Sequence, residues 1–145
     1  KNIIKTEDDQ NHLYQWGLGI NTYIKMKDYT LKKIQDIEIG EETLYGIVTG
    51  TIIHDSKNIT MFNYKDHILS GCQAVFENGI WIRVHQSKYA SIVQYNHTEI
   101  YSITTDTNRI ELNHDILITD YFEINEDSLD METIHNLNLQ SMISK

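Results

Sequence analysis

The sequence predicts an all-β domain, and three observations lead to that expectation. Apolar and polar residues alternate over short stretches, as in residues 80–84 and 100–105, which is the pattern of half-buried strands. Turn-forming Asn, Asp and Gly residues separate these stretches at short intervals. A helical spacing of apolar residues arises only towards the end of the chain. Many short strands with little helix are typical of all-β architecture.

The first third of the chain contains the least regular of the expected elements. Residues 1–16 are polar and acidic and are expected to form an upstream arm, and because the sequence opens without Met we expect it to come from a larger polypeptide. Gly17 and Gly19 flank Leu18, which predicts a tight turn or a close approach of the backbone. Alternation predicts a strand over residues 21–27. The isoleucines of residues 34–39 mark a short bend that ends at Gly40.

Further strands are expected in the middle of the chain. Residues 44–53 form a predicted strand in which Gly46 and Gly50 indicate a bulge or a strong twist. Residues 54–58 are expected to be a loop, and residues 59–62 and 68–69 are strand candidates around a polar turn. Residues 88–97 are ambiguous, part strand and part loop.

A hairpin is the clearest local prediction. Asn78 and Gly79 both accept positive φ, so residues 72–75 and 81–84 are expected to pair as antiparallel strands. Residues 70–73 lie just before this hairpin and contain the single thiol of the chain, Cys72. Any chemical centre is therefore expected beside these four residues.

The last third is predicted to be three strands, the last two of which form a hairpin, followed by a tail. Residues 100–105 form a strand, and residues 109–112 are expected to pair with 116–122 across a turn at 113–115. Asp127 or Ser128 is a suitable helix N-cap, so one helix is expected in the tail. The expected division is an arm at 1–16, a β domain at 17–124 and a helical tail at 125–145.

Composition limits the partners of the domain. The chain has 145 residues, enough for one domain with a proper core, and a net charge of −9 that argues against nucleic acid. The lysines of residues 25–33 are interpreted as a solvated surface. No run approaches the roughly 20 apolar residues of a membrane span, so we expect no membrane partner. The expected partners are flanking segments of the same polypeptide or another protein.

Cysteine and histidine usage argues against a metal centre or a cofactor. One cysteine excludes an internal disulfide and a Cys-rich zinc site, and it fits an intracellular reducing compartment. The seven histidines do not fall at a ligand spacing. His54–Asp55 and His114–Asp115 are interpreted as turn residues. So are the acidic residues that suggest paired carboxylates, because β-turns collect Asp for backbone reasons; these are Glu99, Asp106, Asp115 and Asp120.

Three segments together resemble the Hint domains of hedgehog proteins and inteins, and most of all the Hint-like modules embedded in viral or bacterial polypeptides. Residues 22–28 with 32–41 resemble the opening threonine, strand and "I-x-D-I-x-x-G-D" bend of that family. Residues 70–75 with 79–84 resemble its T-x-x-H motif, hairpin and tryptophan, and residues 100–123 resemble its closing strands. The resemblance implies a horseshoe of short twisted strands. Because some Hint-like modules are viral, association with a virion is expected as an alternative to an intracellular reducing compartment.

Family chemistry requires residues that this chain lacks. The resemblance implies that a Cys or Ser attacks the preceding carbonyl, that the motif histidine protonates the departing nitrogen, and that the threonine hydroxyl holds the strained bond. The nucleophile position falls on Gly17, the threonine on Ser70 and the histidine on Gln73. A glutamine amide cannot release and regain a proton near pH 7. The internal His135–Asn136 pair is interpreted as chance.

The sequence therefore predicts a degenerate Hint-like pocket at Gly17, Ser70, Cys72 and Gln73, with no catalytic residue intact. Cys72 is interpreted as a small buried thiol, the alternative being a relocated nucleophile. Trp81 and Trp16 are expected to serve the core, although Trp16 would occupy the family's position before cleavage. The favoured function is a non-splicing structural or interaction module. The alternatives are a residual self-cleaving domain acting at the bond before Gly17 and an unrelated β domain that binds a protein.

Overall fold

The computed structural model describes residues 17–121, which form short strands and three 3-10 helices, η1–η3. In chain order the elements are β1 (Tyr23–Lys25), β2 (Leu31–Lys33), η1 (Ile34–Asp36), β3 (Glu42–Thr43), β4 (Gly46–Asp55), β5 (Met61–Tyr64), β6 (His67–Ser70), β7 (Ala74–Glu77), β8 (Ile80–Arg83), η2 (Val84–Gln86), β9 (Ala90–Val93), β10 (Glu99–Thr105), β11 (Arg109–Leu112), η3 (Asn113–Asp115) and β12 (Ile116–Thr119).

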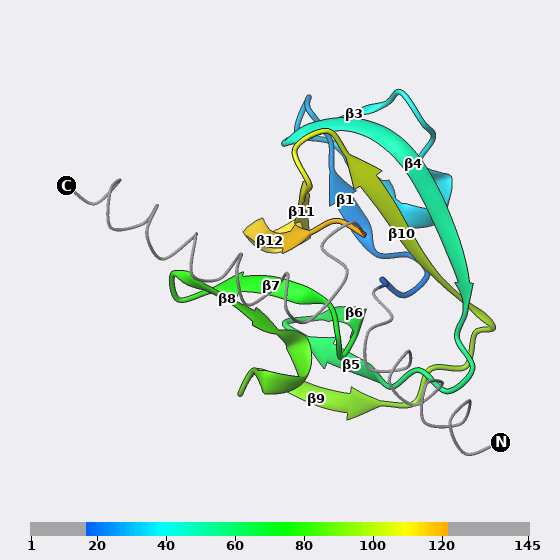
Figure 1. Cartoon of the computed structure of the whole chain (residues 1–145), viewed down its shortest axis with the longest axis vertical. Helices are drawn as coiled ribbons and strands as arrows, with labels where there is room; N and C mark the ends of the chain where they lie inside the picture. The colour runs from blue at the N-terminus through cyan, green and yellow to red at the C-terminus, as the bar shows by residue number, and fades with distance from the viewer. Residues whose placement is uncertain (1–16, 122–145) are drawn as a thin grey trace, which may run out of the picture.

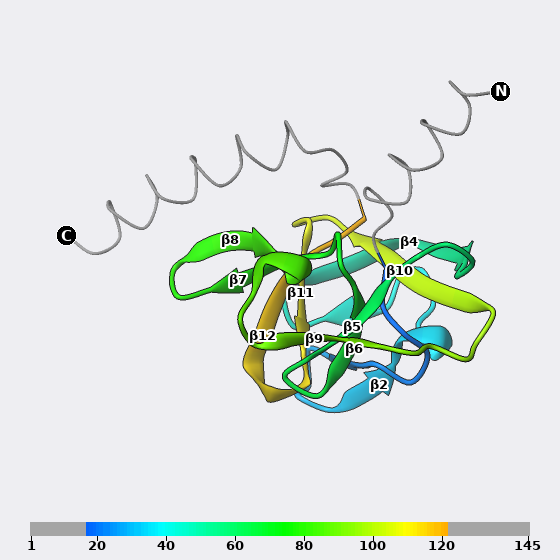
Figure 2. The same ribbon diagram turned by 90° about the horizontal axis from the view of Figure 1, so that it is seen from below.

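The strands assemble into three antiparallel sheets, which confirms the all-β prediction. The largest has the order β2-β1-β11-β12-β7-β8, and the two others have the orders β10-β4-β3 and β6-β5-β9. The long curved strands β4 and β10 run side by side along one flank of the molecule (Figure 1), and the β5–β9 sheet lies away from them. Figure 2 shows the same arrangement from below.

A single large apolar cluster joins the sheets. Leu18, Ile24, Leu69, Leu112 and Ile118 are almost completely buried in it. In β6 and β12 a half-buried residue separates the buried ones, whereas three consecutive residues of β11 are buried. Trp81 is 3% exposed and lies in a smaller cluster with Cys72 and Ala74, so its predicted place in the core is confirmed.

The predicted hairpins are largely confirmed. β7 pairs with β8 across Asn78 and Gly79, which have φ of 53° and 84°. β11 pairs with β12 across the 3-10 turn η3, where His114 and Asp115 adopt positive φ as turn residues. The expectation that Cys72 lies on a strand is wrong, because β7 begins at Ala74 and the preceding residues form a turn.

The loop was predicted to start at residue 54, which is two residues too early, and the interpretation of His54–Asp55 as turn residues is wrong. β4 continues through His54 and Asp55, because these residues pair with Ile100 and Glu99 of β10. The ambiguous residues 88–97 contain β9, which pairs with β5. The upstream arm at 1–16 with Trp16, the tail helix and the boundary at residue 124 lie outside the described residues. Within the described part of the chain, no helix is long and apolar enough to cross a membrane.

Candidate functional site

The chain enters the described domain as a short extended segment held between two strands. Leu18 forms isolated bridges with Leu69 of β6 and Tyr101 of β10. The Leu18 N–H donates to the Tyr101 carbonyl at 2.7 Å, and the Tyr101 N–H returns a bond to the Leu18 carbonyl at 2.9 Å. This confirms the close backbone approach predicted from the two flanking glycines. Gly17–Gly19 thus ties two separate sheets together.

Gly17 fits this position because it lacks a Cβ. A Cβ built at Gly17 would lie 2.6 Å from Cδ1 and 3.0 Å from Cγ1 of Ile100, a side chain that is fully buried. Contacts between carbon atoms are most favourable at about 3.5–4.0 Å, so one of the two groups would have to move. Ile100 occupies the space that a side chain at residue 17 would need.

Gly17 and Ser70 contact each other through two hydrogen bonds. The Gly17 N–H donates to Ser70 Oγ at 3.1 Å, and the Ser70 N–H donates to the Gly17 carbonyl at 2.9 Å. Both residues are buried. The hydroxyl therefore holds the nitrogen of the peptide bond that precedes Gly17, where the sequence resemblance places a threonine hydroxyl.

Gln73 lies in the same turn but directs its side chain elsewhere. Its backbone N–H donates to the Ser70 carbonyl at 3.1 Å. Its side-chain Nε2 donates to the Thr119 carbonyl at 2.9 Å and to the Ala74 carbonyl at 3.2 Å. With 2% exposure, the Gln73 side chain is fixed as a hydrogen-bond donor to the end of β12 in the six-stranded sheet.

Cys72 lies against a buried arginine. Arg83 Nη1 donates to Cys72 Sγ at 2.8 Å and to the Cys72 carbonyl at 2.9 Å, and both residues are 3% exposed. A nearby guanidinium favours the thiolate form of a cysteine, whereas burial beside Ala74 and Trp81 restricts access to the sulfur. Both interpretations of this thiol made from the sequence thus stay predictions.

His54 is the residue near the entry segment that the sequence did not indicate. It pairs with Ile100 across β4 and β10, and its ring lies 5.1 Å from that of Tyr121. Burial lowers the pKa of His54, so the imidazole is neutral near pH 7. Among the described residues, its Nε2 is buried without a hydrogen-bond partner. Only the pairing of distant strands brings His54 here, so local sequence offered no signal for it.

Asp120 is buried, and its carboxylate stabilises a turn. Its carboxylate accepts the Thr105 N–H at 2.8 Å and the Asn108 side-chain amide at 3.2 Å. It fixes the turn between β10 and β11, in keeping with the backbone role predicted for such aspartates. The site as a whole can hold and orient the backbone at Gly17 through these fixed donors and acceptors.

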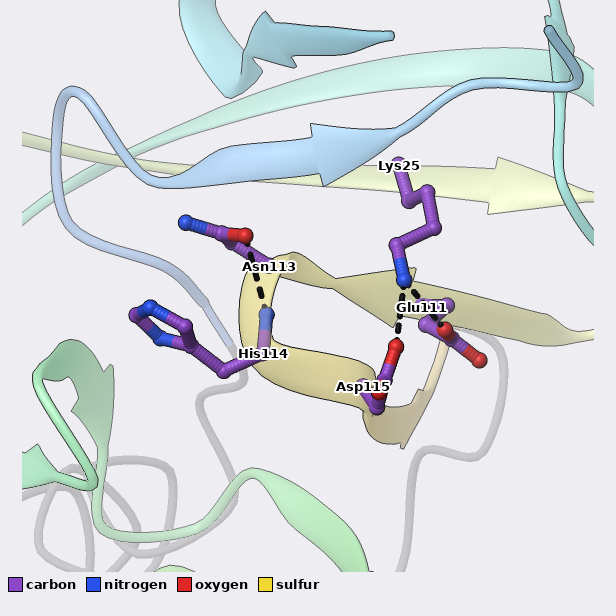
Figure 3. A network of polar contacts seen from close by, with 5 residues as sticks. All are labelled: Lys25, Glu111, Asn113, His114 and Asp115. Atoms are coloured by element: carbon purple, nitrogen blue, oxygen red, sulfur yellow. Dashed lines mark hydrogen bonds and ion pairs between the residues drawn. The ribbon is translucent and has the colours of Figure 1, made fainter. Parts of the chain in front are cut away.

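The most conspicuous ion-pair network lies elsewhere, where β1 meets β11 and η3. Lys25 Nζ contacts Glu111 at 3.0 Å and also Asp115, and Figure 3 shows its ammonium group between the two carboxylates. Hydrogen bonds with Asp115 and Glu111 raise the pKa of Lys25. The network joins β1 and β11 of the six-stranded sheet. No cluster of three or more His, Cys, Asp or Glu suited to a metal ion occurs within residues 17–121.

The fold and site thus describe an all-β domain with a chain segment clamped at its entrance. No protein-family model matches the sequence, and no curated protein sequence does so either. The structure is similar to a DnaB intein from Synechocystis sp. PCC 6803, with a TM-score of 0.48 and 12% identity over 73% of this chain and 99% of that chain. It is also similar to a splice-inactive variant of the AceL NrdHF class 3 split intein, with a TM-score of 0.40 and 13% identity over 72% of this chain and 96% of that chain.

Two of the solved structures to which this fold is similar are thus inteins, one of the two groups of proteins that the sequence resemblance names. At 12% and 13% identity, the likeness concerns the fold and carries nothing about activity.

Proposed function

We propose that this domain is a degenerate Hint-like module without splicing or autoprocessing activity, and that it serves as a structural or protein-interaction domain of a larger polypeptide. The observation that carries the proposal is Gly17. The residue at the expected nucleophile position has no side chain, and buried Ile100 fills the neighbouring space. An acyl shift needs an attacking oxygen or sulfur at that position, so the first step of the family's chemistry has no reactant.

The environment of the peptide bond before Gly17 supports the same proposal. Its nitrogen belongs to Gly17, whose N–H is bound by a neutral hydroxyl, that of Ser70. Gln73, at the position of the expected acid, is an amide already bound to the Thr119 carbonyl. Neither side chain releases a proton near neutral pH. Loss of one member of a cooperating catalytic set often costs nearly as much as loss of all of them.

An intact-mass measurement tests the proposal. The full chain, residues 1–145, is incubated at pH 7 for several days with and without dithiothreitol and hydroxylamine, which cleave thioesters and esters. We expect one unchanged mass in every condition. Release of residues 1–16 would contradict the proposal, because it would show cleavage at the bond before Gly17.

One observation favours residual self-cleavage as a second candidate function. Arg83 lies 2.8 Å from Cys72 Sγ, an arrangement that promotes thiolate formation. If cleavage is observed, Cys72→Ala will abolish it under this second hypothesis, whereas Ser102→Ala, on β10, will leave it unchanged. Cleavage that survives Cys72→Ala would exclude the thiol and leave a water molecule as the attacking group.

A further inference from the structure

The strand β9 offers a free sheet edge. It is the terminal strand of the β6-β5-β9 sheet, and among the described residues it pairs with β5 alone. Figure 1 shows β9 as the outermost strand on its side of the molecule. Ile92 in this strand is 71% exposed, so the edge carries an apolar side chain in solvent. An unpaired edge presents N–H and C=O groups that another extended chain can bind.

Two lysines lie at the beginning of this edge. Lys65 Nζ is 4.7 Å from the centroid of the Tyr89 ring, and Lys88 Nζ is 5.3 Å from the same centroid. Tyr89 is 47% exposed and immediately precedes β9. The tyrosine ring holds both cations near the end of the strand, in a protein whose net charge is −9.

A hollow of about 260 Å³ lies at the other end of β9. Val93, the last residue of the strand, lines it together with the apolar side chains of Ile20 and Ile68. Tyr95 and His97 form another part of the wall, their ring centroids 5.2 Å apart. Asn21, Gln94 and Asn96 line the rest of the hollow, which has room for a single aliphatic or aromatic side chain. The cations and the hollow are separated by about 13 Å of strand.

We propose that the β9 edge binds an extended acidic segment of a partner protein, which adds to the sheet as a further strand. Its acidic residues lie against Lys65 and Lys88, and an apolar residue about four positions away enters the hollow beside Val93. The lysines favour an acidic segment over a basic one by charge complementarity. The proposal requires only the folded domain, so it stands whether or not the bond before Gly17 is cleaved.

Fluorescence anisotropy with synthetic peptides tests the proposal on the full chain. The probe is a fluorescein-labelled decapeptide with two aspartates at one end, an alternating Thr-Val centre and a leucine at the other end. It is made in both sequence directions, because a strand can add parallel or antiparallel. One direction is expected to bind. Replacement of its aspartates by lysines, or of its leucine by glycine, is expected to weaken binding about tenfold.

Backbone methylation separates strand addition from simple charge attraction. In a strand, alternate N–H groups point towards the neighbouring strand. Peptides N-methylated at the odd or at the even positions should therefore differ, with one set losing binding and the other retaining it. Lys65→Glu combined with Lys88→Glu should weaken binding about tenfold, while Lys33→Glu on β2, in a different sheet, should not change it.

Three results would overturn the proposal. They are absence of binding by either peptide direction at millimolar concentration, equal binding of the lysine-substituted peptide, and equal binding of the two N-methylated sets. Sedimentation velocity tests whether a second copy of this chain occupies the edge. A dimer that the peptide does not dissociate would assign the edge to a second copy instead.

Discussion

Gly17 and Ile100 compete for one small volume, and this competition explains the residue at the entrance of the domain. Substitution at residue 17 adds a Cβ 2.6 Å from the Ile100 Cδ1 atom. Because that side chain is fully buried, it has little free space to move into. The packing of Ile100 therefore favours glycine at residue 17.

Gly17→Ala is expected to lower the free energy of unfolding by about 1–3 kcal/mol through overpacking. Ile100→Val removes the Cδ1 atom and by itself costs about 0.5–1.5 kcal/mol. The double variant should therefore lose less stability than the sum of the two single variants. Urea denaturation of all four proteins measures this coupling. Strict additivity would show that the two residues do not compete.

The sequence predicted part of the site and not the rest. The pairing of Gly17 with Ser70, residues 53 positions apart, followed from a family resemblance and not from local pattern. His54 could not be predicted, because a His-Asp pair beside serine and asparagine has the composition of a loop. Its place on β4 is decided by Ile100, which lies far along the chain. Tertiary pairing overrides local preference in such positions.

At the scale of elements, turn chemistry was the most reliable guide. The β7–β8 hairpin was predicted because Asn and Gly tolerate the positive φ that a two-residue connection demands. Strand ends were less predictable, since β7 begins two residues after Cys72 and β4 ends at Asp55. Those limits depend on which backbone groups find partners across the sheet, a property of the folded chain.

Gly79→Ala is expected to reduce the free energy of unfolding by about 1–2 kcal/mol, the cost of placing a Cβ at positive φ. Gly79 has φ of 84°, and no atom lies within 4 Å of the added Cβ, so the backbone alone is responsible. Asn78→Gly, at φ of 53°, is the matched control and should change stability by less than about 0.5 kcal/mol. Thermal denaturation compares the variants. Equal losses of stability in the two variants would show that side-chain contacts, and not the backbone conformation at Gly79, cause the effect.

At the scale of the whole molecule, the buried His67 and the half-buried His54 make stability depend on pH. Burial lowers the pKa of His54 and of His67, and His114 beside His67 acts in the same direction. In the unfolded chain both pKa values return to about 6.5. The unfolded state therefore binds more protons as the pH falls through this value, and folding loses stability. The stability that the two neutral imidazoles contribute is fully present above about pH 6.5. It declines as the pH falls towards the lower pKa values of the folded state.

Urea midpoints measured between pH 7.5 and 5.5 are expected to fall as the pH falls. Hydrogen bonds with Thr30 and Lys32 lower the pKa values of the Asp28 and Glu41 carboxylates. Such carboxylates titrate at lower pH, so the histidines dominate the change in stability between pH 7.5 and 5.5. Changing both His54 and His67 to Gln should flatten the curve. A midpoint that is constant in the unaltered protein would contradict the prediction.

The entry and exit of the described chain share one anchor, and this gives the domain a mechanical property. Leu18 is bonded to Tyr101 and the Tyr121 N–H to the Ile103 carbonyl, so both ends are attached to β10. β10 is itself paired with β4 from Glu99 to Thr105. A tensile force applied through the two flanks would load the Gly17–Ser70 bonds at one end and the Tyr121 bond at the other first, and the Leu18 bonds next. The domain would release its two ends while the β4–β10 ribbon stayed paired, and it would extend in steps under load.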